Sequence, residues 1–400
     1  MTARSPIAPP TLRPLPRLAS RLVPLLALGS ACAMDLPISE RIADVRPLAV
    51  RVEVLDPFAM PDAAVRTEAL PIETILVRPL FVDEVEPFTP ERIEAEIEPL
   101  WLACPLQPIQ GIFACLSNHL PLTLDAIEEC PPVDLGALDP GSGELPAMPA
   151  PCRITGGTPS EPTMQVPLDF NFFLGGDLEI TMIGHRPEVD ATTEDCAAAL
   201  LSEQPLSRDC LYTVQRASIG PDGRILRLAA DAGFEGLDQL GPVPDEDQIA
   251  DPDTNPRIQT MRVVVTDETV RRDDLLRMLA EGPVVDVARG DSLEVHAGQT
   301  LVIETTAPEE DLQTYFIPTD DDAYEERQES FVGDWFRTWG TLLSNDSDDA
   351  VSYNTWQMVP GEQDDAQSEL PPDGRATLYY VLRDDRQGVD WWWFHVQVIP

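Results

Sequence analysis

The chain of 400 residues carries 70 acidic and 27 basic side chains, which gives a formal net charge of −43 at pH 7. Such a charge repels nucleic acid and anionic lipid surfaces, so we expect no nucleic-acid partner. Every basic residue is an arginine, and the absence of lysine excludes Schiff-base chemistry, a lysine general base and a phosphate-binding P-loop.

The N-terminus has the pattern of an export signal. Residues 1–31 contain arginines but no acidic residue, and their apolar run Leu22–Gly29 is too short to span a bilayer. A charged start, a short apolar run and small residues at the end are typical of a signal that is removed. The segment resembles a bacterial lipobox, which implies a lipid on Cys32 and a tether over residues 32–43. The alternative is ordinary signal cleavage after Ala33.

Alternating residues predict a mainly β protein. Apolar residues at every second position from Leu48 to Val54 share one face of an expected strand, while Arg51 and Glu53 point the other way. Residues 93–98 alternate isoleucine and alanine with glutamate, and the same argument predicts a strand there. The 41 prolines are scattered, which favours short elements separated by turns.

Six cysteines follow Cys32, and an even number in an exported chain predicts disulfides. Their spacing matches no C-x-x-C zinc pattern. Cys196 and Cys210 flank one short segment and are the best single pair. The other four can pair in three ways: they are Cys104, Cys115, Cys130 and Cys152.

An N-terminal β-rich domain is expected over residues 44–250. Its stretch from about 104 to 167 is rich in proline and cysteine and poor in periodicity, which indicates an irregular insertion stapled by disulfides. An acidic start followed by an alanine-rich run predicts a short helix over Thr192–Ser202. Strands over Leu211–Ile219 and Arg224–Ala229 flank a Gly-Pro-Asp-Gly turn, so we expect a hairpin.

A C-terminal domain is expected over residues 255–400, after an acidic, apolar-poor boundary at Asp245–Pro256. Its early elements are expected to be strands at 262–265, 293–296 and 301–305 and a helix at 273–281.

The last two strands of the chain have the clearest alternation. One face of the first is expected to hold Ala376, Leu378, Tyr380 and Leu382, and one face of the second Trp392, Phe394, Val396 and Val398. With Trp335 and Trp339 in an earlier strand, this pattern resembles the closing half of an immunoglobulin-like β-sandwich. The resemblance covers residues 255–400 and, more weakly, 44–190.

The whole chain also resembles the long, arginine-rich, lysine-poor lipoproteins of myxobacteria. The strand that follows the lipid-bearing cysteine of that family is similar to Val45–Arg51. The family has no established activity, so the resemblance implies an envelope location and no reaction.

One short motif raises an enzymatic alternative. Gly290-Asp291-Ser292-Leu293 spells the block that names the GDSL esterases, in which the serine is a nucleophile. Here the motif stands late in the chain, and the nearest counterpart of the D-x-x-H pair, Asp390 with His395, has the wrong spacing. We therefore assign no catalytic residue and expect Ser292 to begin a strand.

Calcium is the only cofactor that the sequence suggests. Asp251, Asp253 and Asn255 place hard oxygen ligands at alternate positions in the expected joint between the domains, and Ca²⁺ takes such ligands. No twelve-residue EF-hand loop is present. The hypothesis is that Ca²⁺ stiffens the joint.

Trp391, Trp393 and His395 lie on the face of the last strand opposite the expected core. If exposed, this row is a platform for a sugar or a partner protein. The favoured alternative is that a neighbouring loop or domain covers the face and makes it a second small core.

These observations predict a non-enzymatic lipoprotein of the cell envelope that acts as a surface binding, adhesion or structural module. Its expected partners are the membrane, through a lipid on Cys32, and an envelope protein or polysaccharide. It is expected at the outer membrane or cell surface, or else in the periplasm or medium. The alternatives are a secreted serine hydrolase using Ser292 and a calcium-stabilised adhesion module.

Overall fold

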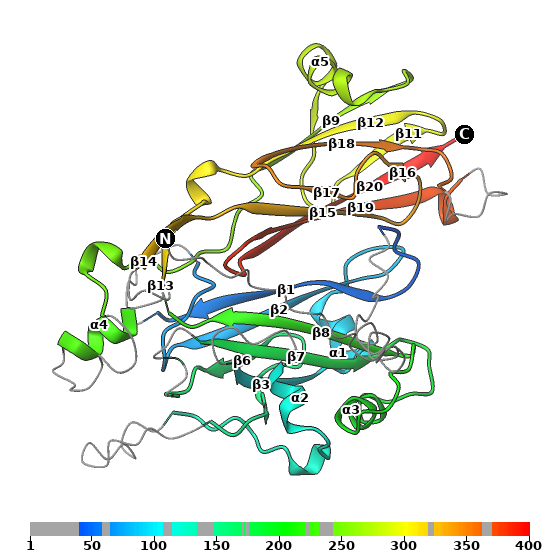
Figure 1. Ribbon diagram of the computed structural model, residues 1–400. Coiled ribbons are helices and arrows are strands. Elements are labelled where there is room, and N and C mark those ends of the chain that lie inside the picture. The colour runs from blue at the N-terminus through cyan, green and yellow to red at the C-terminus, as the bar shows by residue number, and fades with distance from the viewer. Residues whose placement is uncertain are drawn as a thin grey trace, which may run out of the picture. The chain divides into compact units, whose positions relative to one another are not determined.

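The chain is mainly β with a few short helices, as predicted, and its described residues from Glu40 to Pro400 belong to one compact unit (Figure 1). The computed structural model describes residues 40–57, 65–106, 114–133, 148–169, 172, 176–220, 224–231, 243–318, 324–361 and 370–400. The predicted signal and Cys32 lie outside these residues. Among the described helices, none is long and apolar enough to cross a membrane.

Two four-stranded sheets form the N-terminal half of the unit, drawn blue to green in Figure 1. The first has the order β1-β2-β6-β5, with β1 Arg46–Leu55, β2 Thr74–Val82, β6 Pro162–Gln165 and β5 Gly156–Gly157. The second has the order β4-β3-β7-β8, with β4 Cys152–Arg153, β3 Leu100–Leu106, β7 Asp177–His185 and β8 Cys210–Ser218. Both sheets contribute to one apolar cluster, so they form a sandwich.

Strand β1 supplies side chains to two clusters. Val50, Val52 and Val54 alternate into the core of the N-terminal sandwich, as predicted. Leu48, expected on the same face, belongs instead to a second cluster on the far side of the sheet. The register of β1 against β2 shifts between Pro47 and Ala49, and such an irregularity re-aims the side chains beside it.

Two expected strands of this half are helices. The segment around Ile93 forms α1 Pro90–Glu96, because Thr89 accepts a hydrogen bond from the Arg92 amide at the N-cap and Pro90 stands at the first helical position. Ile93 and Ile97 are four residues apart, so one helix face holds both buried side chains.

The second half of the expected hairpin after β8 is also helical. Arg224–Asp231 forms α4, and an ion pair of 3.2 Å joins Arg227 to Asp231 one turn later. The turn at residues 221–223 lies outside the described residues. The remaining described helices of this half are α2 Ala114–His119, α3 Thr193–Leu201 and the 3₁₀ turns η1 Leu124–Ala126 and η5 Glu246–Gln248.

The helix predicted over 192–202 is confirmed as α3. Its N-cap Thr192 accepts from the Asp195 amide at 3.1 Å, and the Asp195 carboxylate accepts the Thr192 amide at 3.0 Å. This reciprocal capping box explains why the helix starts where the sequence indicates.

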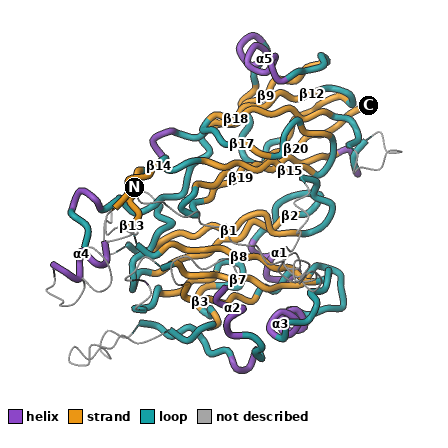
Figure 2. The backbone as a smooth tube through the Cα atoms, in the orientation of Figure 1, coloured by secondary structure: helices purple, strands orange, loops and turns teal. Residues whose placement is uncertain are grey.

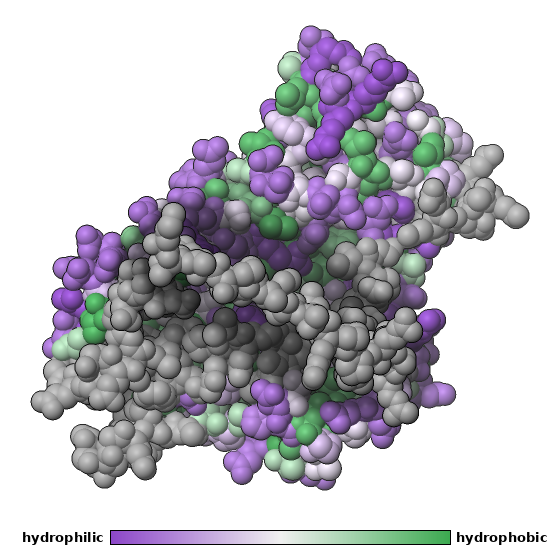
Figure 3. All heavy atoms as spheres, viewed as in Figure 1, coloured by the Kyte–Doolittle hydropathy of each residue, from purple (hydrophilic) through white to green (hydrophobic). Residues whose placement is uncertain are grey.

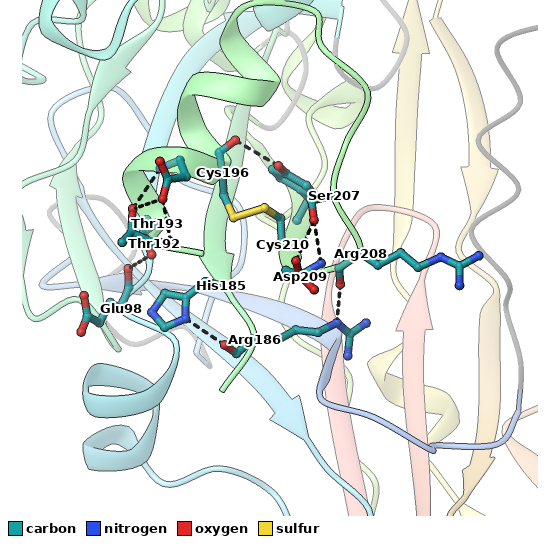
Figure 4. Close-up of a disulfide and its surroundings, with 12 residues drawn as sticks. Glu98, His185, Arg186, Thr192, Thr193, Cys196, Ser207, Arg208, Asp209 and Cys210 are labelled. Carbon is teal, nitrogen blue, oxygen red and sulfur yellow. Dashed lines mark hydrogen bonds between the residues drawn. A yellow bond between two sulfur atoms is a disulfide. The ribbon is translucent and has the colours of Figure 1, made fainter. Parts of the chain in front are cut away.

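Both disulfides of known pairing lie in this half. Cys196 on α3 is bonded to Cys210 at the start of β8, as predicted (Figure 4). Cys130 is bonded to Cys152, which selects among the pairings left open. Cys104 is also disulfide-bonded, and the side chain of Cys115 lies outside the described residues.

The C-terminal half, yellow to red in Figure 1, is a second sandwich of two five-stranded sheets. One has the order β10-β9-β12-β18-β16, with β10 Val285–Asp286, β9 Thr260–Thr266, β12 Thr300–Thr306, β18 Val351–Gln357 and β16 Thr341–Leu342. The other has the order β11-β20-β19-β15-β17, with β11 Ser292–His296, β20 Val389–Ile399, β19 Arg375–Asp384, β15 Phe331–Arg337 and β17 Asp346–Ser347.

The order of these strands follows an immunoglobulin-type sandwich. The neighbours β9-β12-β18 correspond to strands A, B and E, and β20-β19-β15 correspond to G, F and C. Trp335 and Tyr380 stack with ring centroids 4.2 Å apart, and Trp356 meets Phe394 edge-on at 6.0 Å. The alternation predicted for the last two strands is confirmed by this core.

The other described elements of this half lie outside the two sheets (Figure 2). They are the hairpin β13 Thr314–Pro318 and β14 Tyr324–Gln328, the helix α5 Leu275–Glu281, and the 3₁₀ turns η6 Arg272–Asp274, η7 Glu309–Asp311 and η8 Pro372–Gly374. Helix α5 packs Leu275, Met278 and Leu279 on the outer face of β9 and β12. The visible surface around α5 is largely hydrophilic, in keeping with the acidic composition (Figure 3).

We expect replacement of both Cys196 and Cys210 by alanine to lower the free energy of unfolding by about 3 kcal/mol, because the bond closes a loop of about 15 residues in the unfolded chain. Urea unfolding of the oxidised proteins measures the loss. A matched variant without Cys130–Cys152, whose separation is 22 instead of 14 residues, is expected to lose slightly more. Unchanged stability in both variants would contradict the expectation.

Candidate functional site: a buried charged joint

An apolar seam joins the two sandwiches. It is a single cluster that combines residues of β1 and β2 with residues of β15, β19 and β20. Its buried members are Ile42, Leu48, Ala49, Leu80, Val82, Phe336, Tyr379, Val381 and Val389, and Trp391 and Trp393 pack against them partly buried. The sheet of β1 and β2 therefore covers the face that was considered as a binding platform. This is the alternative in which the face forms a second small core.

His395, the third member of that row, is 5% exposed. Its Nδ1 lies 2.9 Å from Thr377 Oγ1, and that hydroxyl donates to the Val85 carbonyl at 2.8 Å. The hydroxyl proton is therefore used, so we assign the imidazole proton to Nδ1, where it donates to Thr377. Burial and the nearby Arg375 lower the pKa of His395 to about 4, so the ring is neutral at pH 7.

Beside the seam, a charged joint is built around Arg386. This residue stands in the loop between β19 and β20, and its side chain is 9% exposed. One guanidinium nitrogen donates to Glu329 at 2.9 Å, and another donates to Glu68 of the N-terminal sandwich at 2.6 Å. A single arginine thus bonds carboxylates from both halves of the unit.

The loop that carries Arg386 has a shape that only certain residues allow. Asp384 Oδ1 accepts hydrogen bonds from the amides of Arg386 at 3.0 Å and Gly388 at 2.7 Å. A Cβ on Gly388 would lie 2.1 Å from Asp384 Oδ2 and 2.8 Å from Pro256, so glycine is required there. On its outer side, the loop accepts a hydrogen bond from Gln215 of β8 at the Gln387 carbonyl, 3.3 Å away.

The segment between the sandwiches completes the joint. The Asp253 amide donates to Glu68 at 2.8 Å, and the Asp253 carbonyl accepts the Thr67 amide at 3.0 Å. Asn255 donates to the Val52 carbonyl and accepts the Val389 amide, both at 2.9 Å. The segment is therefore hydrogen-bonded to both sandwiches.

A second ion cluster stands next to the joint. Asp390 on β20 accepts hydrogen bonds from Arg289 at 2.6 Å, from Arg51 of β1 at 3.4 Å and from the Ile258 amide at 2.9 Å. Because Arg51 belongs to the N-terminal sandwich, this cluster also crosses between the halves.

The carboxyl groups of the joint outnumber its arginine. Glu68, Asp253, Glu329 and Asp384 are all at most 7% exposed. Burial raises the pKa of all four, and for Asp384 burial and repulsion from Glu329 raise the pKa to about 7. Although burial opposes its charge, the attraction of Glu68 and Asp253 raises the pKa of Arg386.

The three residues considered for calcium lie in different surroundings. The Asn255 side chain is occupied by two backbone groups, the Asp251 side chain is exposed, and Asp253 is buried. Within the described residues, no group of three or more His, Cys, Asp or Glu side chains is arranged to hold a metal ion.

Ser292 begins strand β11, as the sequence indicates, and is exposed. Strand β11 runs parallel to β20, with Ser292 opposite His395, so the two side chains leave the same face of the sheet. In the described part of the chain, no hydrogen bond joins the two. Asp390, the acid considered with His395, instead bonds Arg289, Arg51 and Ile258.

The comparisons with known proteins leave the chain without a family. No family model and no curated protein matches it. Among solved structures, the dimeric latent PorU of Porphyromonas gingivalis is similar at a TM-score of 0.17 and 12% identity. That match covers 90% of this chain and only 24% of PorU, and a likeness of this size carries no argument about fold or activity.

Sequence reasoning missed the centre of the joint. Glu68, Glu329 and Arg386 are far apart in the chain, and each has the neighbours of an ordinary acidic or turn residue. The one available signal is the composition of the loop Asp384–Gly388, which is rich in turn residues and indicates a hairpin but not its contacts.

We expect Arg386→Met to lower the free energy of unfolding by about 3–5 kcal/mol, because it leaves Glu68 and Glu329 buried without a counter-charge. Urea unfolding at pH 7 measures the loss. The matched control is Arg277→Met, which removes an arginine that is 51% exposed and is expected to change stability by less than about 0.5 kcal/mol. Equal effects of the two substitutions would contradict the assigned role.

Proposed function

We propose that this chain is an exported, lipid-anchored module of a bacterial cell envelope that binds an envelope protein or polysaccharide without catalysing a reaction. The observation that carries the proposal is the joint, in which Arg386 and the apolar seam hold two sandwiches as one unit. Two sandwiches joined by these contacts present their surface loops together, which suits a structural or adhesive role on a surface.

Two further features support the proposal. The disulfides Cys130–Cys152 and Cys196–Cys210 are typical of an oxidising compartment outside the cytosol. The acidic charge favours solubility of the mature chain and opposes insertion of its body into an anionic membrane, so attachment would depend on the lipid. A calcium-stabilised version of this module is a separate proposal, and it is tested by comparing the melting curves in millimolar Ca²⁺ and in EDTA.

The anchor is tested at Cys32. We expect the mature protein from a membrane fraction to have an intact mass that exceeds the peptide by a diacyl or triacyl lipid, and we expect Cys32→Ala to abolish both the added mass and the membrane association. Cys104→Ala is the matched control and is expected to keep the lipid. A native N-terminus at Met34 with no added mass would contradict lipidation and indicate plain secretion.

The binding role needs a test of its own. Purified chain beginning at Met34 is expected to sediment with isolated envelope polysaccharide or envelope membranes in a saturable manner, and excess unlabelled chain is expected to displace it. Absence of binding to both preparations would contradict the binding role and leave a purely structural one.

A second candidate function rests on the pairing of Ser292 with His395 across β11 and β20. In a hydrolase, Ser292 Oγ would attack an ester carbonyl while His395 accepted its proton and passed it to the departing alcohol, and water would then release the acid. With the imidazole proton assigned to Nδ1, Nε2 is the nitrogen that would accept the proton, and the pKa of about 4 makes it a weak base.

On the hydrolase hypothesis, the purified chain hydrolyses short-chain p-nitrophenyl esters, and Ser292→Ala reduces the rate at least a hundredfold. Ser207→Ala, which alters an exposed serine on the other sandwich, is the control and should leave the rate unchanged. A rate at the level of free imidazole, or equal rates in both variants, would exclude this candidate.

A further inference from the structure

Asp253 is held in an unusual environment. Its backbone is fixed by hydrogen bonds to Thr67 and Glu68, and its side chain is 0% exposed. Neither carboxyl oxygen has a hydrogen-bond partner among the described residues. The other buried carboxyl groups of the joint differ in this respect, since Glu68, Glu329 and Asp384 each accept at least one hydrogen bond.

The charges around Asp253 come from every part of the joint. Glu68 and Arg66 belong to the segment before β2, Glu329 precedes β15, and Asp384 and Arg386 belong to the β19–β20 hairpin. Arg66 is paired with Glu73 at 2.5 Å, and Arg386 is shared between Glu68 and Glu329. Arg224 of α4 attracts Glu68 from a further side. No described arginine makes an ion pair with Asp253, and Arg386 attracts it only from a greater distance.

An ionised carboxylate is costly in this position. A buried charge without a hydrogen bond or partner costs far more free energy than the neutral acid, and the group takes a proton instead. We propose that Asp253 holds a proton at neutral pH and that loss of this proton in alkaline solution loosens the joint between the two sandwiches.

The direction of the effect follows from the surroundings. Burial and then repulsion from Asp384 raise the pKa of Asp253 well above its ordinary value of 3.8, and they outweigh the attraction of Arg386, which lowers it. A carboxyl group with a raised pKa in the folded protein stabilises it relatively at low pH, and this advantage is lost as the pH rises through the folded-state pKa. For Asp384 the window runs from its ordinary 3.8 to about 7. Deprotonation of Asp253 places a further negative charge against Glu68, Glu329 and Asp384.

The structural consequence is local. The Asp253 backbone bonds the segment containing Thr67 and Glu68, while Arg386 reaches the same Glu68 from the hairpin. Repulsion at Asp253 therefore acts on the contact that ties the hairpin to the N-terminal sandwich. The disulfides and the cores of the sandwiches lie outside this contact and are expected to stay intact.

The proton is measured through unfolding. At pH 6.5 we expect unfolding of the wild type to release about one more proton than unfolding of Asp253→Asn, because the unfolded aspartate is ionised at that pH. The slope of the free energy of unfolding against pH, or direct pH-stat titration, gives the number of protons released on unfolding. Asp348→Asn removes the same formal charge from an exposed loop and is expected to release as many protons as the wild type.

A second variant protects the test against misfolding of the first. Asp384→Asn keeps the oxygen that accepts the Arg386 and Gly388 amides, and it is expected to reduce proton release in the same direction. In hydrogen exchange, corrected for the intrinsic effect of pH, amides 67–68 and 386–388 of the wild type are expected to lose protection between pH 6 and pH 8.5. Asp253→Asn is expected to keep that protection.

Two outcomes would overturn the proposal. One is equal proton release by the wild type and by both Asn variants. The other is stabilisation of the wild type, but not of Asp253→Asn, by millimolar Ca²⁺ over EDTA at pH 7, since a cation rather than a proton would then neutralise the site. An unchanged melting curve with Ca²⁺ supports the proposal that a proton, and not a cation, neutralises Asp253.

Discussion

The arrangement of the two sandwiches depends on the compensation of buried carboxylates by Arg386. Its guanidinium bonds Glu68 on one side and Glu329 on the other, so the same charge satisfies acids from both halves of the unit. The bond to Glu68 forms only when the hairpin between β19 and β20 lies against the segment before β2. A buried ion network adds little net stability over an apolar contact, but it strongly disfavours misaligned states that would leave charges unpaired. The joint therefore specifies an orientation.

The apolar seam supplies the complementary contribution. Leu80 and Val82 of β2 pack with Tyr379 and Val381 of β19, and burial of such side chains stabilises the contact without fixing its register. Trp391 and Trp393 extend this contact on β20. Attraction from the seam and alignment from the charged joint together account for the compact unit formed by residues 40–400.

The sequence predicted elements whose signals are local. The acidic start after Thr192 was sufficient to predict helix α3, and the alternation of the last two strands was sufficient to predict their core face. The pairing of Cys196 with Cys210 was predicted correctly because the two residues flank one short segment. The prediction of a strand over residues 93–98 was wrong, because isoleucines at 93 and 97 fit both the two-residue period of a strand and the four-residue spacing of a helix. Thr89 and Pro90 were the deciding signals. The joint could not be predicted, because Glu68, Asp253 and Arg386 meet only through the tertiary fold.

The register shift in β1 bears on how such a protein can evolve. Val50 contributes to the N-terminal core and Leu48 to the contact with the other sandwich, so a single strand belongs to two packing environments. Insertion or deletion of one residue near Pro47 would exchange these assignments and place wrong side chains on both faces at once. The N-terminal sandwich is therefore not a freely transferable module: recombination that joins it to another partner must carry a complementary apolar sheet with it.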